Sequence, residues 1–209
     1  MRAALRLVLT SVAMLLHGGA LAADLRVEAP QVVAGDKWEF AGNRNGVPTL
    51  WVIEILDRGD DGRIRARVEF LGREMIEYLD GSMNFLFGGR LDQPQVLAGY
   101  PMKTGDVWSF DIPLPSPHSS YTGNGRVIAQ RTLTVPAGTF ECLEVVAEGR
   151  RSTGTTYRNF YRRTRWFCPE IRWFAQEVYQ VTTANNNNPA ENASIEGEHR
   201  LIRFTPGRP

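Results

Sequence analysis

The sequence predicts an all-β protein built from antiparallel sheets, arranged as a sandwich or a half-open barrel. Three observations support this fold class. Hydrophobic and polar side chains alternate along several short runs, and turn-forming residues separate these runs roughly every 8 to 15 positions. In addition, almost no segment keeps a sustained helical period.

The clearest alternation covers residues 63–70 (RIRARVEF). In a strand this pattern puts its apolar side chains on one face and its charged side chains on the other, as expected for a half-buried strand. A β-branched run at residues 50–56 precedes it, and the intervening residues 57–62 (DRGDDG) are rich in turn formers. The two runs therefore predict a β-hairpin.

The same pattern recurs further along the chain. Residues 126–135 and 139–147 predict a second hairpin, with Pro136, Ala137 and Gly138 at its turn. Further strands are expected at residues 156–166, 173–182 and 198–204. The polar stretch 184–192 predicts a mobile loop, because it has too little apolar surface to offset the entropy of ordering.

The pattern Gly-Asp-x-Trp-x-Phe occurs twice, at residues 35–40 and 105–110. Gly-Asp is typical of a turn, and the Trp and Phe that follow share one face of a strand. The pattern favours an aromatic core anchor over an exposed platform for a sugar or lipid. Its repetition raises the hypothesis that one domain, residues 23–209, consists of two related halves, 23–100 and 101–209.

The first 22 residues are typical of a secretory signal peptide. Arg2 and Arg6 precede an apolar run that is too short to span a bilayer, and Ala20-Leu21-Ala22 matches a cleavage site. We therefore expect a periplasmic or secreted protein that has no transmembrane segment once the signal is removed.

The remaining chain carries 22 basic and 23 acidic residues, which gives no global charge for binding nucleic acid. No motif predicts a cofactor, and neither cysteine has the neighbours of a metal site. His118 falls in a Pro/Ser-rich loop and His199 in the last predicted strand, and no established catalytic motif surrounds either residue. The sequence therefore favours a protein that is not an enzyme, although a catalytic pair of carboxylates stays open.

The chain has two cysteines, Cys142 and Cys168. In an exported protein an even number of cysteines favours a disulfide, and two cysteines allow one connectivity. The alternative is a pair of buried free thiols.

Residues 157–168 (YRNFYRRTRWFC) interleave arginines with aromatic side chains. Such a pattern can bind phosphates, carboxylates or flat rings, which in the cell envelope means lipid head groups, lipopolysaccharide or peptidoglycan. The candidate ligand-binding residues are Arg158, Arg162, Arg163, Arg165 and Trp166. The alternative is an exposed strand whose arginines pair with Glu141, Glu144 and Glu148.

Three segments together resemble an exported bacterial family of unknown function. They are the Gly-Asp-x-Trp turn at residues 105–110, the hairpin sequence Val-Pro-Ala-Gly-Thr-Phe within 135–145, and Trp-Phe-Cys-Pro-Glu at 166–170. The resemblance covers residues 105–181 and implies a periplasmic antiparallel β fold, with a disulfide joining the last two motifs. The family supplies no reaction or ligand, and this chain departs from its pattern after Glu170, where a glycine is usual.

We therefore expect an exported cell-envelope protein that acts as a binding or assembly module for a lipid, a glycan or a protein. Two alternatives belong to other classes: a periplasmic hydrolase that uses acidic residues, and a structural partner of an envelope or secretion complex.

Overall fold

The structure is a computed structural model that describes residues 24–96, 98–114, 119–153, 157–185 and 187–208. The expected signal peptide and His118 lie outside these ranges. The described chain consists of β-strands joined by turns and three short 3-10 segments, so the all-β prediction is confirmed. No helix in these ranges is long and apolar enough to cross a membrane.

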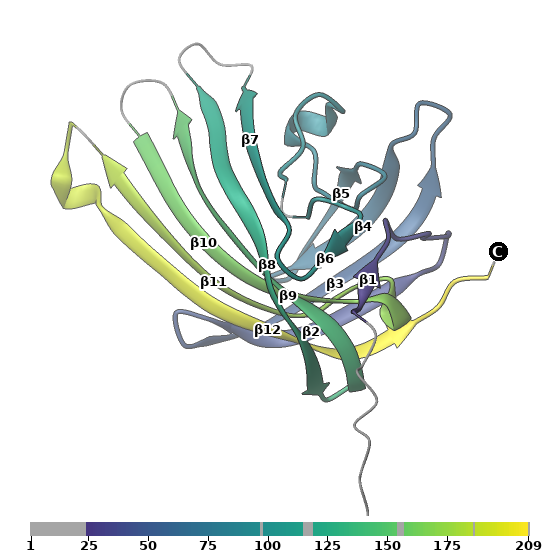
Figure 1. Ribbon diagram of the computed structural model, residues 1–209. Coiled ribbons are helices and arrows are strands. Elements are labelled where there is room, and N and C mark those ends of the chain that lie inside the picture. Colours follow the sequence, from purple (N-terminus) through teal and green to yellow (C-terminus); the bar gives the residue numbers. More distant parts are fainter. Residues whose placement is uncertain (1–23, 97, 115–118, 154–156, 186, 209) are drawn as a thin grey trace, which may run out of the picture.

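A 10-stranded antiparallel sheet dominates the molecule, in the order β5-β4-β3-β2-β12-β11-β10-β9-β8-β7. It curls into a cup without closing, and the edges are β5 and β7 (Figure 1). Its strands are β2 (Lys37–Arg44), β3 (Val47–Arg58), β4 (Ile64–Phe70), β5 (Arg73–Leu79), β7 (Val107–Pro113), β8 (Ser120–Val135), β9 (Gly138–Thr153), β10 (Tyr157–Cys168), β11 (Trp173–Asn185) and β12 (Ala193–Thr205).

A second, 2-stranded sheet pairs β1 (Arg26–Val27) with β6 (Met102–Lys103). Val27 and Met102 join the same hydrophobic core as the large sheet, so the small sheet packs against the large one. The 3-10 segments are η1 (Phe87–Gly89), η2 (Pro169–Ile171) and η3 (Pro189–Glu191).

Both predicted hairpins are present. In β4 the burial alternates strictly from Ile64 onwards, because every second side chain of a strand faces the core. β3 pairs with β4, and β8 pairs with β9 around the predicted turn, where Val135 faces Gly138. The pairing of β2 with β12 then joins the strands from the two ends of the chain into one sheet.

The segment between β5 and β6 runs between the two edges of the sheet. Phe85 forms an isolated bridge with Leu79 at the end of β5, and Gln93 donates a side-chain hydrogen bond to the carbonyl oxygen of Pro113 in β7 (3.2 Å). The segment therefore contacts both edge strands and covers part of the concave face.

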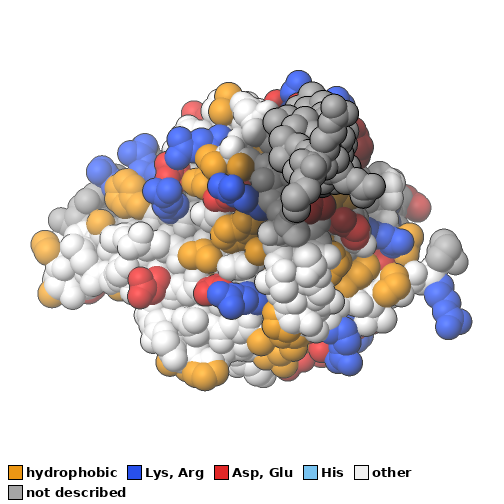
Figure 2. Space-filling model, turned by 60° about the horizontal axis from the view of Figure 1, so that its bottom comes forward, with side chains coloured by type: hydrophobic (Ala, Val, Ile, Leu, Met, Phe, Trp, Pro, Cys, Tyr) orange, Lys and Arg blue, Asp and Glu red, His pale blue; other side chains and the backbone are white. Residues whose placement is uncertain are grey.

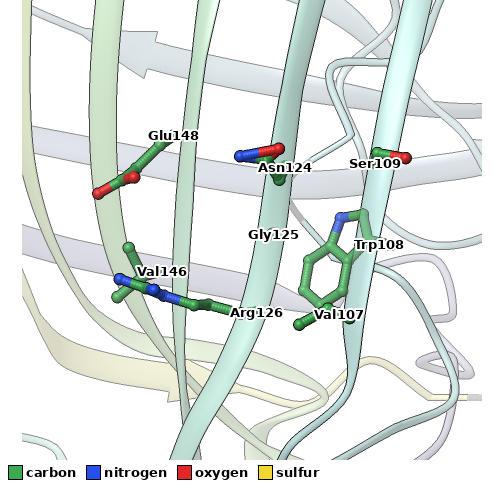
Figure 3. Close-up of a pocket in the computed structure, with 8 residues that line it drawn as sticks. All are labelled: Val107, Trp108, Ser109, Asn124, Gly125, Arg126, Val146 and Glu148. Carbon is green, nitrogen blue, oxygen red and sulfur yellow. The ribbon is translucent and has the colours of Figure 1, made fainter.

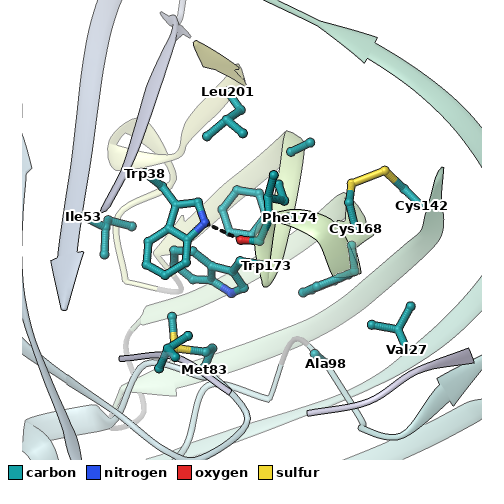
Figure 4. Close-up of a cluster of buried hydrophobic side chains, with 14 of the residues drawn as sticks. Val27, Trp38, Ile53, Met83, Ala98, Cys142, Cys168, Trp173, Phe174 and Leu201 are labelled. Atoms are coloured by element: carbon teal, nitrogen blue, oxygen red, sulfur yellow. Dashed lines mark hydrogen bonds between the residues drawn. A yellow bond between two sulfur atoms is a disulfide. The ribbon is translucent and has the colours of Figure 1, made fainter. Parts of the chain in front are cut away.

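Aromatic side chains fill the core (Figure 4). Trp38, Phe40 and Phe174 are fully buried, and Trp173 is nearly so. The indole Nε1 of Trp38 donates a hydrogen bond to the carbonyl oxygen of Ile171 (2.8 Å), which satisfies its one polar atom. The predicted disulfide between Cys142 and Cys168 lies beside this cluster and ties β9 to the end of β10.

Candidate functional site

The first Gly-Asp-x-Trp-x-Phe copy is a hydrogen-bonded turn followed by a buried strand. Gly35 has a φ of 86°, in the left-handed region that favours glycine. Its amide donates to the carbonyl oxygen of Ile55 (2.8 Å), and the amide of Ile55 donates to the carbonyl oxygen of Asp36 (2.9 Å). The Asp36 carboxylate in turn accepts the amide of Val33 (2.9 Å).

The second copy repeats this geometry. Gly105 has a φ of 90° and donates its amide to the carbonyl oxygen of Val127 (3.0 Å), whose amide donates to the carbonyl oxygen of Asp106 (2.8 Å). The Asp106 carboxylate accepts the amide of Lys103 (2.9 Å). The motif is therefore a structural device used twice, and for Trp38, which is 0 % exposed, the predicted core anchor is confirmed.

Trp108, the tryptophan of the second copy, is only half-buried and lines a surface pocket of about 440 Å³ (Figure 3). Gly125 of β8 makes room for its ring, since a Cβ there would come within 2.1 Å of the indole. The charged side chains at this pocket are Arg126, which is exposed, and Glu148, which pairs with Arg162. A ligand in this pocket would therefore meet charged side chains that are exposed to solvent or already paired.

The five candidate binding residues of β10 do not form one group. Arg158 and Arg162 are exposed, whereas Arg163 and Arg165 lie on the opposite face of the strand, inside the cup. Trp166 is half-buried and packs against the core cluster.

On the outer face, Arg162 forms an ion pair with Glu148 of the neighbouring strand (3.2 Å). Figure 2 shows that basic, acidic and hydrophobic side chains are interspersed on the underside of the molecule. The alternative of paired charges is therefore present for Glu148, whereas Glu141 and Glu144 bond side chains of β8 instead of the arginines of β10.

Inside the cup, Glu177 of β11 binds both inward-facing arginines. Its Oε1 accepts hydrogen bonds from Arg163 Nη1 (2.9 Å) and Arg165 Nε (2.8 Å). The side chain of Arg165 is only 5 % exposed and its guanidinium lies over the ring of Phe174 at 4.3 Å, a cation–π contact. Two guanidinium groups against one carboxylate leave one net positive charge within this group of side chains.

His199 of β12 completes this set of side chains, which we call the ionic cluster: Arg163, Arg165, Glu177 and His199. Its Nε2 contacts the hydroxyl of Thr49 (3.1 Å), and its Nδ1 lies 3.9 Å from Glu177 Oε2. The residue is 2 % exposed, yet Nδ1 has no hydrogen-bond partner among the residues that the structure describes.

The charges of the ionic cluster control the pKa of Glu177. Burial on its own would raise the pKa of this carboxyl group, but the nearby charges of Arg165 and Arg163, helped by His199, outweigh burial and hold it well below its ordinary value. Glu177 is therefore an ionised acceptor that is already engaged by two arginines.

Three members of the ionic cluster, Arg163, Glu177 and His199, line one side of a pocket of about 430 Å³ on the concave face, called here the concave pocket. Its remaining side chains are mostly apolar and come from both halves of the sheet and from the covering segment. The lining residues are Arg44, Trp51, Val68, Phe70, Met75, Glu77, Phe85, Gln95, Arg163, Glu177, Tyr179, Val181, Ile195 and His199.

The register of the sheet explains how these residues meet. Cross-strand pairing puts Arg44, Gly197, Tyr179 and Arg163 in one row, and Gly42, His199, Glu177 and Arg165 in the next. The row below holds Phe70, Trp51, Phe40 and Leu201, of which Phe40 and Leu201 belong to the core and Trp51 packs against it. The ionic cluster therefore lies between the filled core and the open part of the cup.

Gly197 makes room for Tyr179 within this arrangement. A Cβ at Gly197 would come within 2.5 Å of the Tyr179 hydroxyl, so a larger residue would displace the phenol. Tyr179 stacks on the imidazole of His199 with ring centroids 5.7 Å apart, and the guanidinium of Arg163 lies over its ring at 5.6 Å. The glycine thus allows an aromatic side chain to hold two members of the ionic cluster.

Glu77 of β5 lines the concave pocket from the opposite wall. Burial raises the pKa of its carboxyl group, and no neighbouring cation is among the causes of that shift. The pocket thus contains two carboxyl groups whose pKa values are shifted in opposite directions.

Sequence reasoning missed Glu177, His199, Glu77 and Arg44. Strand alternation contains a signal for two of them: Glu177 has the same parity as the buried Ala175 and Tyr179, and His199 that of Leu201. A charged or polar residue at a core-facing position is informative, because such groups are seldom buried without partners. No group of three or more metal-binding side chains gathers within the described ranges.

No family model matches the chain, and no curated protein matches it. Two solved structures are similar to it. In each comparison the sequence identity is 14%, and the alignment covers 87% of this chain and 100% of the other chain. One is a Bacteroides fragilis protein described as exported and as having a YmcC-like fold, with a TM-score of 0.44. The other is a Parabacteroides distasonis protein described as a lipoprotein, with a TM-score of 0.43.

Proposed function

We propose that this protein is an exported, non-enzymatic binding module of the cell envelope that holds a small amphipathic molecule in its concave pocket. The observation that carries the proposal is the combination of an apolar wall with a buried ionic cluster in one cavity. A volume of about 430 Å³ falls within the range of small-molecule sites, roughly 300–1,000 Å³. The disulfide and the expected signal peptide both support export.

The cost of burying charge supports a binding role for the ionic cluster. Desolvating ions costs several kcal/mol each, and a well-packed apolar set of similar volume is often as stable as a buried ion pair. Arg163, Arg165 and Glu177 also leave a net positive charge, which a purely structural pair would not need. A ligand that uses this charge gives a reason for its presence.

The test has two parts, applied to the mature protein. Native mass spectrometry of protein purified gently from its own host should show a bound small molecule. In addition, the neutral dye Nile red should bind saturably to the emptied protein, and Val181→Trp, which fills the pocket, should weaken that binding at least about tenfold.

Val178→Trp is the matched control, because Val178 lies on the same strand, is 40% exposed and does not line the concave pocket. Its dye affinity should stay within about twofold of the unmodified protein. The proposal would be refuted if mass spectrometry showed only the protein without a bound molecule and if Val181→Trp left the affinity for the dye unchanged.

A hydrolase is the second candidate, and one observation favours it. Glu77 and Glu177 share the pocket, and their pKa values are shifted apart, as in enzymes that use one carboxylic acid and one carboxylate. Glu177 is committed to two arginines, however, and its side chain is only 2 % exposed. Hydrolysis of a chromogenic ester or glycoside that Glu77→Gln and Glu177→Gln both abolish, while near-ultraviolet circular dichroism shows both variants folded, would establish this alternative.

A further inference from the structure

We infer that the ligand of the concave pocket is a single-chain amphiphile with a terminal carboxylate, which pairs with Arg163 and Arg44 while its chain lies along Trp51, Phe70 and Phe85. The inference rests on the proposed binding function and deepens it. It follows from the distribution of charge, of unused hydrogen-bond donors and of half-buried aromatic surface in the pocket.

Arg163 is the cation best placed to meet a ligand. A guanidinium has five N–H donors, and only Nη1 of Arg163 is bonded to Glu177. Its side chain is 28 % exposed, whereas that of Arg165 is 5 % exposed and makes two contacts with the same carboxylate oxygen. Arg163 thus bonds Glu177 within the ionic cluster and still has N–H groups that can donate hydrogen bonds to a ligand in the pocket.

Arg44 lies in the same cross-strand row as Arg163, at the other end of that row. It is half-buried and lines the same pocket. A guanidinium binds a carboxylate with charge-assisted hydrogen bonds, which are about twice as strong as neutral ones. The two arginines therefore provide an anion site in the polar part of the cavity.

The buried imidazole of His199 points to a ligand independently. His199 is one of the lining residues of the pocket, and its buried Nδ1 has no hydrogen-bond partner among the described residues, with Oε2 of Glu177 3.9 Å away. Buried polar atoms are nearly always bonded, so this unpaired nitrogen is a further unsatisfied polar group beside the cavity. A ligand head group that reached this nitrogen would bond it as donor or acceptor, according to the imidazole tautomer.

The balance of charge favours one negative charge over two. Arg44, Arg163 and Arg165 against Glu177 leave two net positive charges around the pocket, and Glu77 on the opposite wall reduces this to one once it ionises. A second negative charge on the ligand would be repelled by Glu77 once that group ionises. A carboxylate fits this balance better than a doubly charged phosphate does.

The apolar wall provides for the chain of the ligand. Trp51, Phe70 and Phe85 are half-buried, and their rings lie next to each other, with the Trp51 ring centroid 6.4 Å from both phenyl centroids. Met75 adds an exposed apolar side chain to the same wall. Each methylene that this surface takes out of water should strengthen binding about fourfold.

The test measures how well matched 12-carbon amphiphiles displace Nile red from the mature protein, below their micelle concentrations. Laurate should displace the dye at a concentration at least about tenfold lower than dodecanol, because only laurate can form charge-assisted hydrogen bonds. Dodecyl phosphate, the third competitor, should be no better than laurate.

Variants locate the anion site. Arg163→Gln and Arg44→Gln should each weaken laurate about tenfold and leave dodecanol unchanged. Arg158→Gln is the matched control: it removes the same charge from the exposed face of β10 and should change neither competitor. If loss of its bond to Glu177 unfolds Arg163→Gln, as near-ultraviolet circular dichroism would reveal, Arg44→Gln still decides, since it breaks no bond within the ionic cluster.

The outcomes separate this inference from the proposed function. Equal displacement by laurate and dodecanol would overturn the carboxylate and leave the binding module standing. Displacement by dodecyl phosphate at tenfold lower concentration than laurate would assign a phosphate head group instead. A loss of laurate affinity in Arg158→Gln alone would move the anion site to the outer face, and a protein that binds neither dye nor competitors would refute both proposals.

Discussion

The two copies of the Gly-Asp-x-Trp-x-Phe motif allow one substitution to be compared with its own internal control. Asp36 is 0 % exposed, and its two carboxylate oxygens accept hydrogen bonds from two backbone amides, those of Val33 (2.9 Å) and Gly207 (2.8 Å). Arg172 Nη1 lies 2.9 Å from both oxygens. Asp106 accepts a single backbone amide, that of Lys103, through Oδ2.

Replacing aspartate by asparagine therefore affects the two turns differently. An amide keeps one acceptor oxygen, which is enough for the bond between Asp106 and Lys103. At Asp36 the new NH₂ group must face either the Val33 or the Gly207 amide, so one charge-assisted hydrogen bond is lost and two donors oppose each other. That loss costs about 1.5–3 kcal/mol, and the ion pair with the 35 % exposed Arg172 side chain adds less than about 1 kcal/mol because solvent screens it.

We expect Asp36→Asn to lower the free energy of unfolding by about 2–4 kcal/mol and Asp106→Asn by less than about 1 kcal/mol. Urea denaturation of the mature, disulfide-intact variants, followed by tryptophan fluorescence, measures both values. Equal losses in the two variants would show that backbone geometry alone, and not the number of accepted bonds, sets the importance of this aspartate.

Three further predictions concern the concave pocket and the disulfide. Glu177→Gln should lower the free energy of unfolding by about 3–5 kcal/mol at pH 7, since it leaves the inward-facing arginines without their carboxylate. The pKa of Glu177 is depressed in the folded protein, so the stabilisation that its ionised form gives is present above the ordinary pKa of 4.5 and is lost as the pH falls below that value. Urea titrations should therefore show that the difference in stability between the variant and the unmodified protein becomes smaller in acid. Glu77→Gln should act in the opposite sense, because burial raises the pKa of Glu77 and its ionisation therefore costs stability as the pH rises through the pKa of the folded state. Compared with the unmodified protein, the variant should be more stable by up to about 1 kcal/mol at pH 8 and equally stable at pH 3. Replacing both Cys142 and Cys168, 26 positions apart, by serine should cost about 3 kcal/mol in the same assay, and an unchanged urea midpoint would contradict that estimate.

The fold was predictable wherever one face of a strand is buried. The segments 50–56, 126–135 and 139–147 fall within observed strands, and 63–70 does so apart from Arg63, because apolar and polar side chains alternate along them. Strand β5 was not predicted, because it has little buried surface on either face. It is an edge strand whose first four residues are exposed, and its inward positions include Glu77, so the sequence carries little alternation there.

The binding residues were harder to predict than the strands. Alternation along β10 separates Arg158 and Arg162 from Arg163 and Arg165, but it does not say which pair faces inward. In most strands the apolar side chains answer that question. In this segment arginines and aromatic residues occur at both parities, so only the pairing with β9 and β11 decides it.

The position of the ionic cluster also depends on register, which no single strand encodes. Glu177 meets Arg165 and His199 because three strands align these positions in one row, and Arg44 reaches the next row only through the pairing of β2 with β12. The row that holds Glu177 and His199 lies next to the row of Phe40 and Leu201, which belong to the core. If stability were the only requirement, apolar side chains could continue the core upward at no greater cost than a buried ion pair. The chain instead places a net positive charge at this level, together with an imidazole nitrogen that bonds none of the described residues, beside aromatic rings that are only half-buried. The net charge and the exposed ring surface both cost stability, and one amphipathic carboxylate would offset the first with its head group and cover the second with its chain.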